Sequence, residues 1–196
     1  MKLKINLLTI LLTFLLLMTA NKVLAMPDIS AGETNFDFFK GCYILRNNVR
    51  FVDNGRTMTA NRATVQLTSQ KVWATGNVTL VQEGIKFRCD KMFLQGAKMN
   101  VEVIGNVNFL QDSAVKISSD VGVFSWNSKV ADFYGRVKLK TSTVNIDSNL
   151  KAESGNIDGI YDHVQYNIVE KKIMALDKHY SAIPKAEFSE ADPIEN

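Results

Sequence analysis

Apolar and polar residues alternate along most of the chain after residue 40. Around Gly76, the apolar residues Val72, Ala74, Val78 and Leu80 stand at every second position, and their neighbours are mostly polar. The same arrangement recurs twice further along the chain. A period of two places one face of a β-strand on a core and the other face in water. Helical periodicity after residue 25 is limited to a weak signal at 36–39, so the pattern predicts an all-β protein.

A short motif recurs along the chain at an almost constant interval. Gly-Asn-Val begins at residues 76 and 105, Gly-Arg-Val at 135 and Asn-Asn-Val at 47. A second series of Asn and Asp residues interleaves with the first: Asn61, Asp90, Asp120 and Asn149. We call the first residue of each motif, and each of these Asn and Asp residues, a mark. The marks, of which Asp162 is the last, follow one another at an even spacing. Such repetition predicts a series of similar two-strand units.

Turn-forming residues lie midway between successive marks. Asn54-Gly55 is the strongest of these signals, because both residues tolerate the positive φ of a tight hairpin. The other turn positions are 68–70, 82–84, 96–98, 111–113, 127–128, 141–143 and 155–156, and a last hairpin is expected to turn at 169–171. Hairpins at these positions give an antiparallel meander, in which consecutive marks face each other on adjacent strands.

The line of marks predicts a crease across the sheet. Gly, Asn and Asp are the residues that best accept bulged or left-handed backbone. Each strand would bend at its mark, so its two halves would enter different layers and the alternating apolar residues would line the inside. The predicted fold is an antiparallel, creased (V-shaped) β-jellyroll built from a two-strand repeat with the spacing of Gly76 and Gly105. The pattern leaves open whether the interior is a packed core or an open groove.

The segment 1–25 has the layout of a secretory signal peptide. Lys2 and Lys4 precede an apolar run, and Val23-Leu24-Ala25 supplies a cleavage site after Ala25. The run is shorter than the roughly 20 apolar residues of a bilayer span. We therefore expect an exported mature chain with three parts, a lead-in segment (26–41), the β-jellyroll (42–180) and a disordered acidic tail (181–196).

Composition argues against a nucleic-acid-binding surface. The 196 residues are 46% hydrophobic and 22% charged, which is typical of a globular domain. The formal charge is +3, but three lysines lie in the segment 1–25, which holds no acidic residue. The rest of the chain carries 20 basic and 20 acidic residues and is neutral. It lacks the excess positive charge typical of nucleic-acid binding, so no such partner is expected.

The sequence offers no recognisable catalytic or metal-binding constellation. The two histidines, His163 and His179, lie far along the chain from the two cysteines, Cys42 and Cys89, and the four have no metal-ligand spacing. In the second series, Asp90 and Asp120 are carboxylates that could form an acid–base pair. Asn replaces them elsewhere in the series, so a role in the backbone explains all four marks better. We expect His163 to be a half-exposed strand residue, and we expect no enzyme activity, cofactor or metal. A disulfide between the two cysteines stays open.

Three segments of the sequence, taken in order, carry a resemblance to a known family. Residues 58–63 read Met-Thr-Ala-Asn-Arg-Ala, and residues 74–80 read Ala-Thr-Gly-Asn-Val-Thr-Leu. Residues 166–175 form the expected last hairpin. In this serial order the segments resemble strands and the closing hairpin of the LptA/OstA family of periplasmic lipopolysaccharide-transport proteins. The resemblance extends from about Cys42 to Leu176, and Asn47 departs from it by replacing the first Gly.

The resemblance implies a non-enzymatic periplasmic carrier or bridge. Such a protein would hold the lipid A acyl chains of lipopolysaccharide between the two layers of its V-shaped jellyroll during transport from the inner to the outer membrane. Its partners would be an LptC-like inner-membrane protein and an LptD-like outer-membrane protein, with edge-to-edge self-association between copies. The apolar residues expected to line the interior are Phe51, Met58, Val78, Leu80, Phe87, Val107, Phe109, Ile117, Val137, Leu139 and Ile146.

The same side chains would also fill the core of any β-sandwich. The alternative is therefore an exported structural or adhesive β-repeat module that binds protein or polysaccharide and has no lipid cavity. A carbohydrate-active enzyme is a third hypothesis, and it would require two inward-facing carboxylates in one cleft.

Overall fold

The computed structural model describes residues 28–53, 55–147 and 155–179. In these ranges the chain forms eleven β-strands and no helix, so the predicted all-β class is confirmed. The strands are β1 (Asp28–Ser30), β2 (Glu33–Asp37), β3 (Cys42–Asp53), β4 (Arg56–Gln66), β5 (Lys71–Gln82), β6 (Ile85–Gln95), β7 (Asn100–Gln111), β8 (Val115–Ser125), β9 (Val130–Ile146), β10 (Gly155–Asn167) and β11 (Lys172–Asp177). None of the described segments is an apolar helix of membrane-spanning length.

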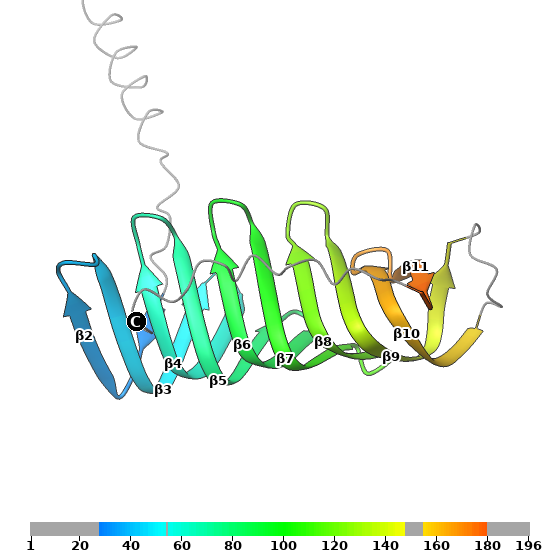
Figure 1. Ribbon diagram of the computed structural model, residues 1–196, viewed down its shortest axis with the longest axis horizontal. Helices are drawn as coiled ribbons and strands as arrows, with labels where there is room; N and C mark the ends of the chain where they lie inside the picture. The colour runs from blue at the N-terminus through cyan, green and yellow to red at the C-terminus, as the bar shows by residue number, and fades with distance from the viewer. Residues whose placement is uncertain (1–27, 54, 148–154, 180–196) are drawn as a thin grey trace, which may run out of the picture.

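All eleven strands belong to one sheet, and their order in the sheet follows the chain (Figure 1). From β3 to β11 each strand pairs antiparallel with the next. The N-terminal edge is divided, because β1 pairs with the C-terminal half of β3 and β2 pairs with its N-terminal half. The predicted antiparallel meander is confirmed.

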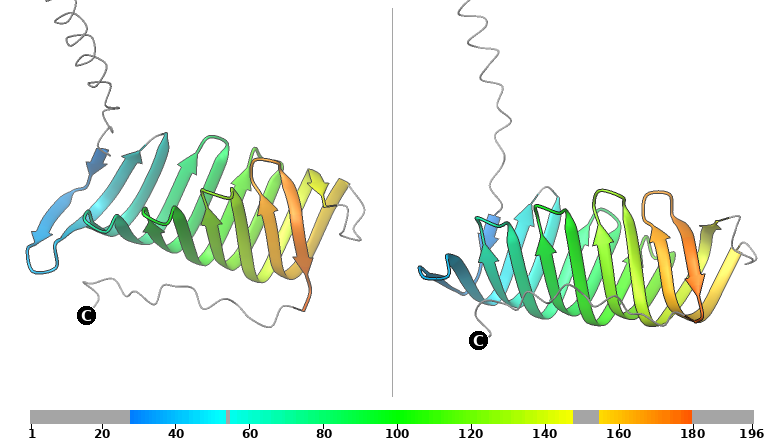
Figure 2. Two further views of the ribbon diagram at one scale, coloured as in Figure 1. Left: turned by 90° about the horizontal axis from the view of Figure 1, so that it is seen from above. Right: turned by 45° about the horizontal axis from the view of Figure 1, so that its top comes forward.

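The sheet is folded along a crease, which gives it the shape of a trough (Figure 2). The register of every strand pair from β3–β4 to β8–β9 shifts near the middle of the strands, and the β9–β10 pair shifts at Tyr161 and His163. We call the two halves of the sheet layer 1 and layer 2. Layer 1 holds β2, β11, the N-terminal halves of the odd strands β3 to β9 and the C-terminal halves of the even strands β4 to β10. Layer 2 holds β1 and the remaining halves.

The marks divide into two structural roles at the crease. On the odd strands the mark and the next residue both take positive φ, as in Gly105 (φ 76°) and Asn106 (φ 47°). On the even strands the mark stays outside the left-handed region and lies against the facing glycine. A Cβ atom on Gly105 would lie 3.0 Å from the Cβ of Asp90, and Gly76 and Asn61 are related in the same way. The predicted facing of consecutive marks is confirmed here, and the glycine is required both by its φ and by this close approach.

The interior between the layers is one continuous apolar cluster that extends from Leu45 to Ile173. Aromatic rings meet across it: the centroid of the Phe109 ring lies 5.5 Å from that of Phe133 and 5.8 Å from that of Tyr166. The sequence left open a packed core or an open groove. In this conformation the described interior is packed.

The C-terminal end of the trough is closed by β11. This strand pairs antiparallel with β10 in layer 1 and, at Lys172 and Ile173, parallel with the end of β9 in layer 2. The Nζ of Lys172 lies 2.7 Å from a carboxylate oxygen of Asp147, which adds an ion pair between the layers. At the N-terminal end, β1 and β2 pair with β3 on one side and with no described strand on the other.

Some sequence expectations were wrong in detail. No turn forms at 141–143 or 155–156: β9 continues to Ile146 because it pairs along its length with β10 and then with β11, and residues 155–156 begin β10. The expected lead-in segment (26–41) contains β1 and β2, and its bounds stay a prediction. Cys42 and Cys89 are buried and are not joined by a disulfide. The signal peptide, the mark Asn149 and the acidic tail 181–196 lie outside the described residues.

Candidate functional site

The residues predicted to line the interior form the inner face of layer 2. Seven of them are successive cross-strand partners and make one row across the sheet: Phe51, Met58, Leu80, Phe87, Phe109, Ile117 and Leu139. Val78, Val107 and Val137 form a second row nearer the crease, and Ile146 pairs with Ile173 where β11 closes the trough. All are buried except Phe51 and Ile146, which are half-buried.

The prediction missed the opposite wall. The inner face of layer 1 contributes Val72, Ala74, Met92, Val101, Val103, Phe124, Phe133, Val164 and Tyr166 to the same apolar cluster. The alternation before each Gly mark indicates some of these positions, but the candidate residues were taken from the other halves of the strands. Only the bend at the crease brings the two halves of one strand face to face.

The inner faces contact each other directly in the described structure. Phe109 packs against rings of both walls, with its centroid 4.9 Å from Phe87 in layer 2 and 5.5 Å from Phe133 in layer 1. Phe87 in turn lies 6.2 Å from Phe124 of layer 1. A ligand can therefore enter this part of the interior only if side chains move or the layers separate.

A cleft of about 550 Å³ lies at the open side of the trough, between the hairpin turns of the two layers. We call this the mouth. Its lining comes from both layers: Gln82, Glu83, Gly84, Ile85, Gln111 and Asp112 on one side, and Phe124, Trp126, Lys129, Ile168, Val169 and Lys171 on the other. The volume lies within the range of about 300–1,000 Å³ that is usual for small-molecule sites.

Polar contacts connect the two sides of the mouth. The Tyr166 hydroxyl donates to Gln111 Oε1 at 2.8 Å, and Gln111 Nε2 donates to the Ile168 carbonyl at 3.0 Å. Lys171 Nζ lies 2.8 Å from Asp112 Oδ2. Burial, together with the nearby Asp112 charge, raises the pKa of Tyr166, so this hydroxyl stays protonated and keeps its role as a donor.

Trp126 makes two further contacts across the mouth. Its Nε1–H donates to Gln82 Oε1 at 3.2 Å, and the Arg56 guanidinium lies 4.8 Å from the centre of its ring. An exposed ion pair contributes about 0–1 kcal/mol, and a cation over an indole ring about 0.5–2 kcal/mol. The ion pair and the cation–π contact are therefore individually weak, whereas the buried hydrogen bonds of Gln111 cost more to break.

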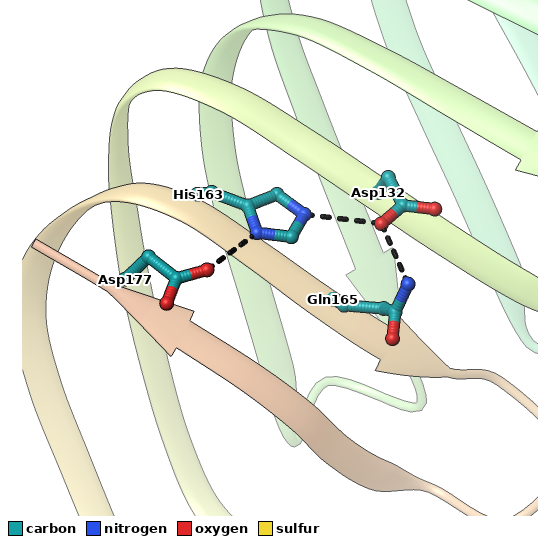
Figure 3. Close-up of polar contacts among 4 residues, drawn as sticks. All are labelled: Asp132, His163, Gln165 and Asp177. Atoms are coloured by element: carbon teal, nitrogen blue, oxygen red, sulfur yellow. Dashed lines mark hydrogen bonds and ion pairs between the residues drawn. The ribbon is translucent and has the colours of Figure 1, made fainter. Parts of the chain in front are cut away.

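A second polar cluster lies on the outer face of layer 1 (Figure 3). His163 Nδ1 is 2.9 Å from Asp177 Oδ2, and His163 Nε2 is 3.0 Å from Asp132 Oδ1. Gln165 Nε2 donates to the same Asp132 oxygen at 2.9 Å, and the imidazole stacks on the Tyr134 ring at 4.7 Å. The expectation of a half-exposed His163 was wrong, because this side chain is buried.

The environment of His163 favours its charged form. Burial lowers its pKa, but the hydrogen bonds and negative charges of Asp132 and Asp177 outweigh that effect, so the pKa is raised above 6.5. A doubly protonated imidazole can donate to both carboxylates at once. Among the described residues no group of His, Cys, Asp or Glu is placed to hold a metal ion, and the cluster ties β9, β10 and β11 together.

The buried thiol of Cys89 is unreactive near neutral pH. Burial, helped by the charge of Asp90, raises its pKa to about 12, while a backbone hydrogen bond at Ile104 opposes the shift. Because the thiolate is the reactive form of cysteine, this side chain is inert near neutral pH.

Comparison with known proteins gives a likeness to solved structures but no match of sequence. No family model matches the chain, and no curated protein matches it. Among solved structures it is similar to LptH from Pseudomonas aeruginosa, described as the LptA homologous periplasmic component of the conserved lipopolysaccharide transport device. The two share 12% sequence identity, the alignment covers 68% of this chain and 92% of LptH, and the TM-score is 0.48.

Proposed function

We propose that this protein is an exported, non-enzymatic carrier that shields the acyl chains of lipopolysaccharide between its two layers. One observation carries the proposal: a continuous apolar interior lies between two layers that meet at a crease, and a cleft opens between the layers at their other edge. The sequence resemblance to the LptA/OstA family supplies the lipid class, and the predicted signal peptide supplies the periplasmic location.

The physical need for such a carrier follows from the cost of exposing acyl chains to water. Each buried CH₂ group is worth about 0.8 kcal/mol, so a lipid with several acyl chains does not cross an aqueous compartment unaided. The row from Phe51 to Leu139 offers one apolar surface across seven strands, and the inner face of layer 1 faces it. The exposed Lys171–Asp112 ion pair at the mouth is weak enough to be exchanged for contacts with a ligand, and the Gln111 hydrogen bonds would have to be replaced by polar contacts with it.

The N-terminal edge of the sheet suits a partner protein. On its other side β2 pairs with no described strand, and backbone groups on such an edge are a template for adding another strand. Phe36 on β2 and Phe38 and Phe39 directly after it are exposed. We propose that an LptC-like inner-membrane protein, an LptD-like outer-membrane protein or a second copy of this chain adds to such an edge, so that the bound lipid passes from one trough to the next.

The alternative function is favoured by a specific observation. The interior is filled, with Phe109, Ile117 and Phe133 at most 2% exposed. A core of this kind is what a structural or adhesive β-repeat module would have. The two functions differ in one property, because only a carrier must let its layers separate.

The test uses the mature chain, residues 26–196, and lipopolysaccharide that carries a photo-crosslinkable acyl chain. Free saccharide serves as competitor. A carrier gives saturable crosslinks that the saccharide does not block and that map to Phe87, Phe109 or Ile117. Absence of crosslinks from a folded protein would support the structural module instead.

Two sets of variants sharpen this test. Phe109→Asp and Ile117→Asp, each first shown to be folded by circular dichroism, should lose crosslinking, while Lys138→Asp on the exposed face should keep it. In the double variant Asp112→Cys/Lys171→Cys, a short reducible crosslinker would hold the mouth closed. Lipid binding should fall on crosslinking and return on reduction, and unchanged binding in the closed form would contradict passage through the mouth.

A further inference from the structure

The outer face of layer 2 carries basic side chains on three strands. Along β6, β8 and β9 these residues alternate with the inner-facing row from Phe51 to Leu139, so they point to the outside of the trough. We call them the basic face, and its members are Lys86, Arg88, Lys116, Lys138 and Lys140. All are exposed except Lys86, which is half-buried.

Cross-strand pairing gathers the basic face into two adjacent rows. One row across β6 to β9 consists of Lys86, Leu110, Lys116 and Lys140. The neighbouring row consists of Arg88, Asn108, Ser118 and Lys138. Three strand spacings of about 4.8 Å and one two-residue step of about 6.7 Å bring the five backbone positions within an area of about 14 Å by 7 Å.

The basic face contains no acidic residue of its own. The layer 2 halves of β4 to β9 hold neither Asp nor Glu at 56–60, 78–82, 85–89, 107–111, 115–119 and 137–146. The carboxylates that border the face are Asp158 on β10, Asp90 and Asp120 at the crease, and Glu83 and Asp112 in the turns. Lys140 Nζ lies 3.6 Å from Asp158 Oδ2, and the other four basic side chains form no ion pair with a described residue.

One pair within the basic face opposes folding. Lys116 and Lys140 are direct cross-strand partners, and like charges directly opposite each other on antiparallel strands are destabilising. Asp158 offsets the charge of Lys140, but Lys116 has no such partner among the described residues. The fold alone gives no reason for a lysine at this position. An anionic partner that lies across the face would attract both lysines and remove their repulsion.

The chemistry of the basic face favours lipid headgroups over nucleic acid. None of its five members lines the cleft at the mouth, so the charges are spread over the outside of a sheet. The side chains between them in the two rows are Leu110, Asn108 and Ser118, and none is an aromatic ring on which a base could stack. Dispersed lysines and arginines suit a plane of phosphate headgroups, which attracts them within a Debye length. The predicted signal peptide would bring the chain to a compartment bounded by membranes.

We propose that the basic face docks this protein on a bilayer that contains anionic phospholipids, through the phosphates of their headgroups. The contact is peripheral, because the apolar row from Phe51 to Leu139 lies on the other side of layer 2 and does not enter the bilayer. The docking relies on the predicted export but not on acyl chains entering the interior. Docking and acyl-chain binding can therefore fail independently of each other.

The test is co-sedimentation of the mature chain, residues 26–196, with vesicles of phosphatidylglycerol and phosphatidylcholine. Binding should be saturable, should weaken as salt screens the charges, and should be absent with pure phosphatidylcholine vesicles. Duplex DNA and dextran sulfate are tested in parallel. Binding to either of these polymers without binding to the mixed vesicles would overturn the proposal and assign the basic face to a soluble polyanion.

A double variant locates the charges that matter. A lysine close to an anionic bilayer strengthens binding about fivefold, so Lys116→Gln/Lys138→Gln should bind the mixed vesicles at least about tenfold more weakly. The control Lys91→Gln/Lys178→Gln has the same net charge and removes two exposed lysines outside the basic face. It should change binding by less than about twofold. Equal weakening in both double variants would show that only net charge acts, and would overturn the docking face.

A dye attached to the protein reports which face meets the bilayer. Cys42 and Cys89 are buried, so a new exposed cysteine can be labelled selectively. A label at Val81→Cys, beside Lys86 and 42% exposed in the native chain, should be quenched by a quencher carried on the lipid headgroups. A label at Leu67→Cys, in the turn after β4 in layer 1, should not be quenched. Quenching at the Leu67 position alone, or at neither position, would contradict docking through the basic face.

Discussion

Phe109 lies at the centre of the interior, and its replacement by Ala tests how firmly the two layers are packed together. The side chain is 2% exposed and its ring meets Phe87, Phe133 and Tyr166 at centroid distances of 4.9, 5.5 and 5.8 Å. Two of these three rings belong to layer 1. Removing the Phe109 ring therefore removes contacts within layer 2 and across the trough.

The loss of unfolding free energy caused by Phe109→Ala can be calculated in two ways. A buried aromatic side chain removes about 150–250 Å² from water, which at about 25 cal/mol per Å² gives about 4–6 kcal/mol. This is an upper bound, because the denatured chain already buries part of its apolar surface. Phe→Ala replacements in protein cores cost about 3–5 kcal/mol. We expect Phe109→Ala to lower the free energy of unfolding by about 4 kcal/mol, a large share of the roughly 5–15 kcal/mol that stabilises a typical domain.

The assay is urea unfolding of the mature chain followed by circular dichroism. Ile160→Ala is the matched control, because Ile160 lies on a neighbouring part of the sheet and is 63% exposed. We expect the control to change the free energy of unfolding by no more than about 0.5 kcal/mol. A loss below about 1 kcal/mol for Phe109→Ala, with the slope against urea unchanged, would show that the layers are not packed through this ring.

Two further predictions concern the crease and the outer face. Gly105→Ala should destabilise more than Gly41→Ala: both glycines have positive φ, worth about 1–2 kcal/mol for Ala, but only at Gly105 would the new Cβ meet a side chain, and at Gly41 nothing lies within 4 Å. Equal losses in urea unfolding would remove the close approach from the explanation. His163 should make stability depend on pH. Because its folded pKa is raised above 6.5, its ion pairs with Asp132 and Asp177 stabilise fully below pH 6.5 and are lost as the pH rises through the folded pKa. The stability difference between wild type and His163→Gln should therefore shrink as the pH rises, and a difference that grows would contradict the assignment.

The sequence by itself determined the all-β class, the meander and the crease. These features are local, since alternation with period two sets the faces of each strand and the turn residues set where each strand ends. The Gly marks specify a bend because only residues that tolerate left-handed backbone fit there, as Gly105 and Asn106 illustrate. The expectation failed where pairing overrode local signals, since β9 continues through 141–143 to pair with β10 and β11.

Tertiary structure alone decided which side chains face one another across the trough. Phe109 and Tyr166 are far apart in the sequence, and no local pattern indicates that their rings meet or that Gln111 bonds to the Tyr166 hydroxyl. The burial of His163 and of Phe93 on the outer face could not be predicted from the sequence either, because the alternation assigns that face to water. The physical reason is common to these cases: a strand fixes the direction of its side chains, but what they contact depends on how the whole sheet bends and on which strands it brings together.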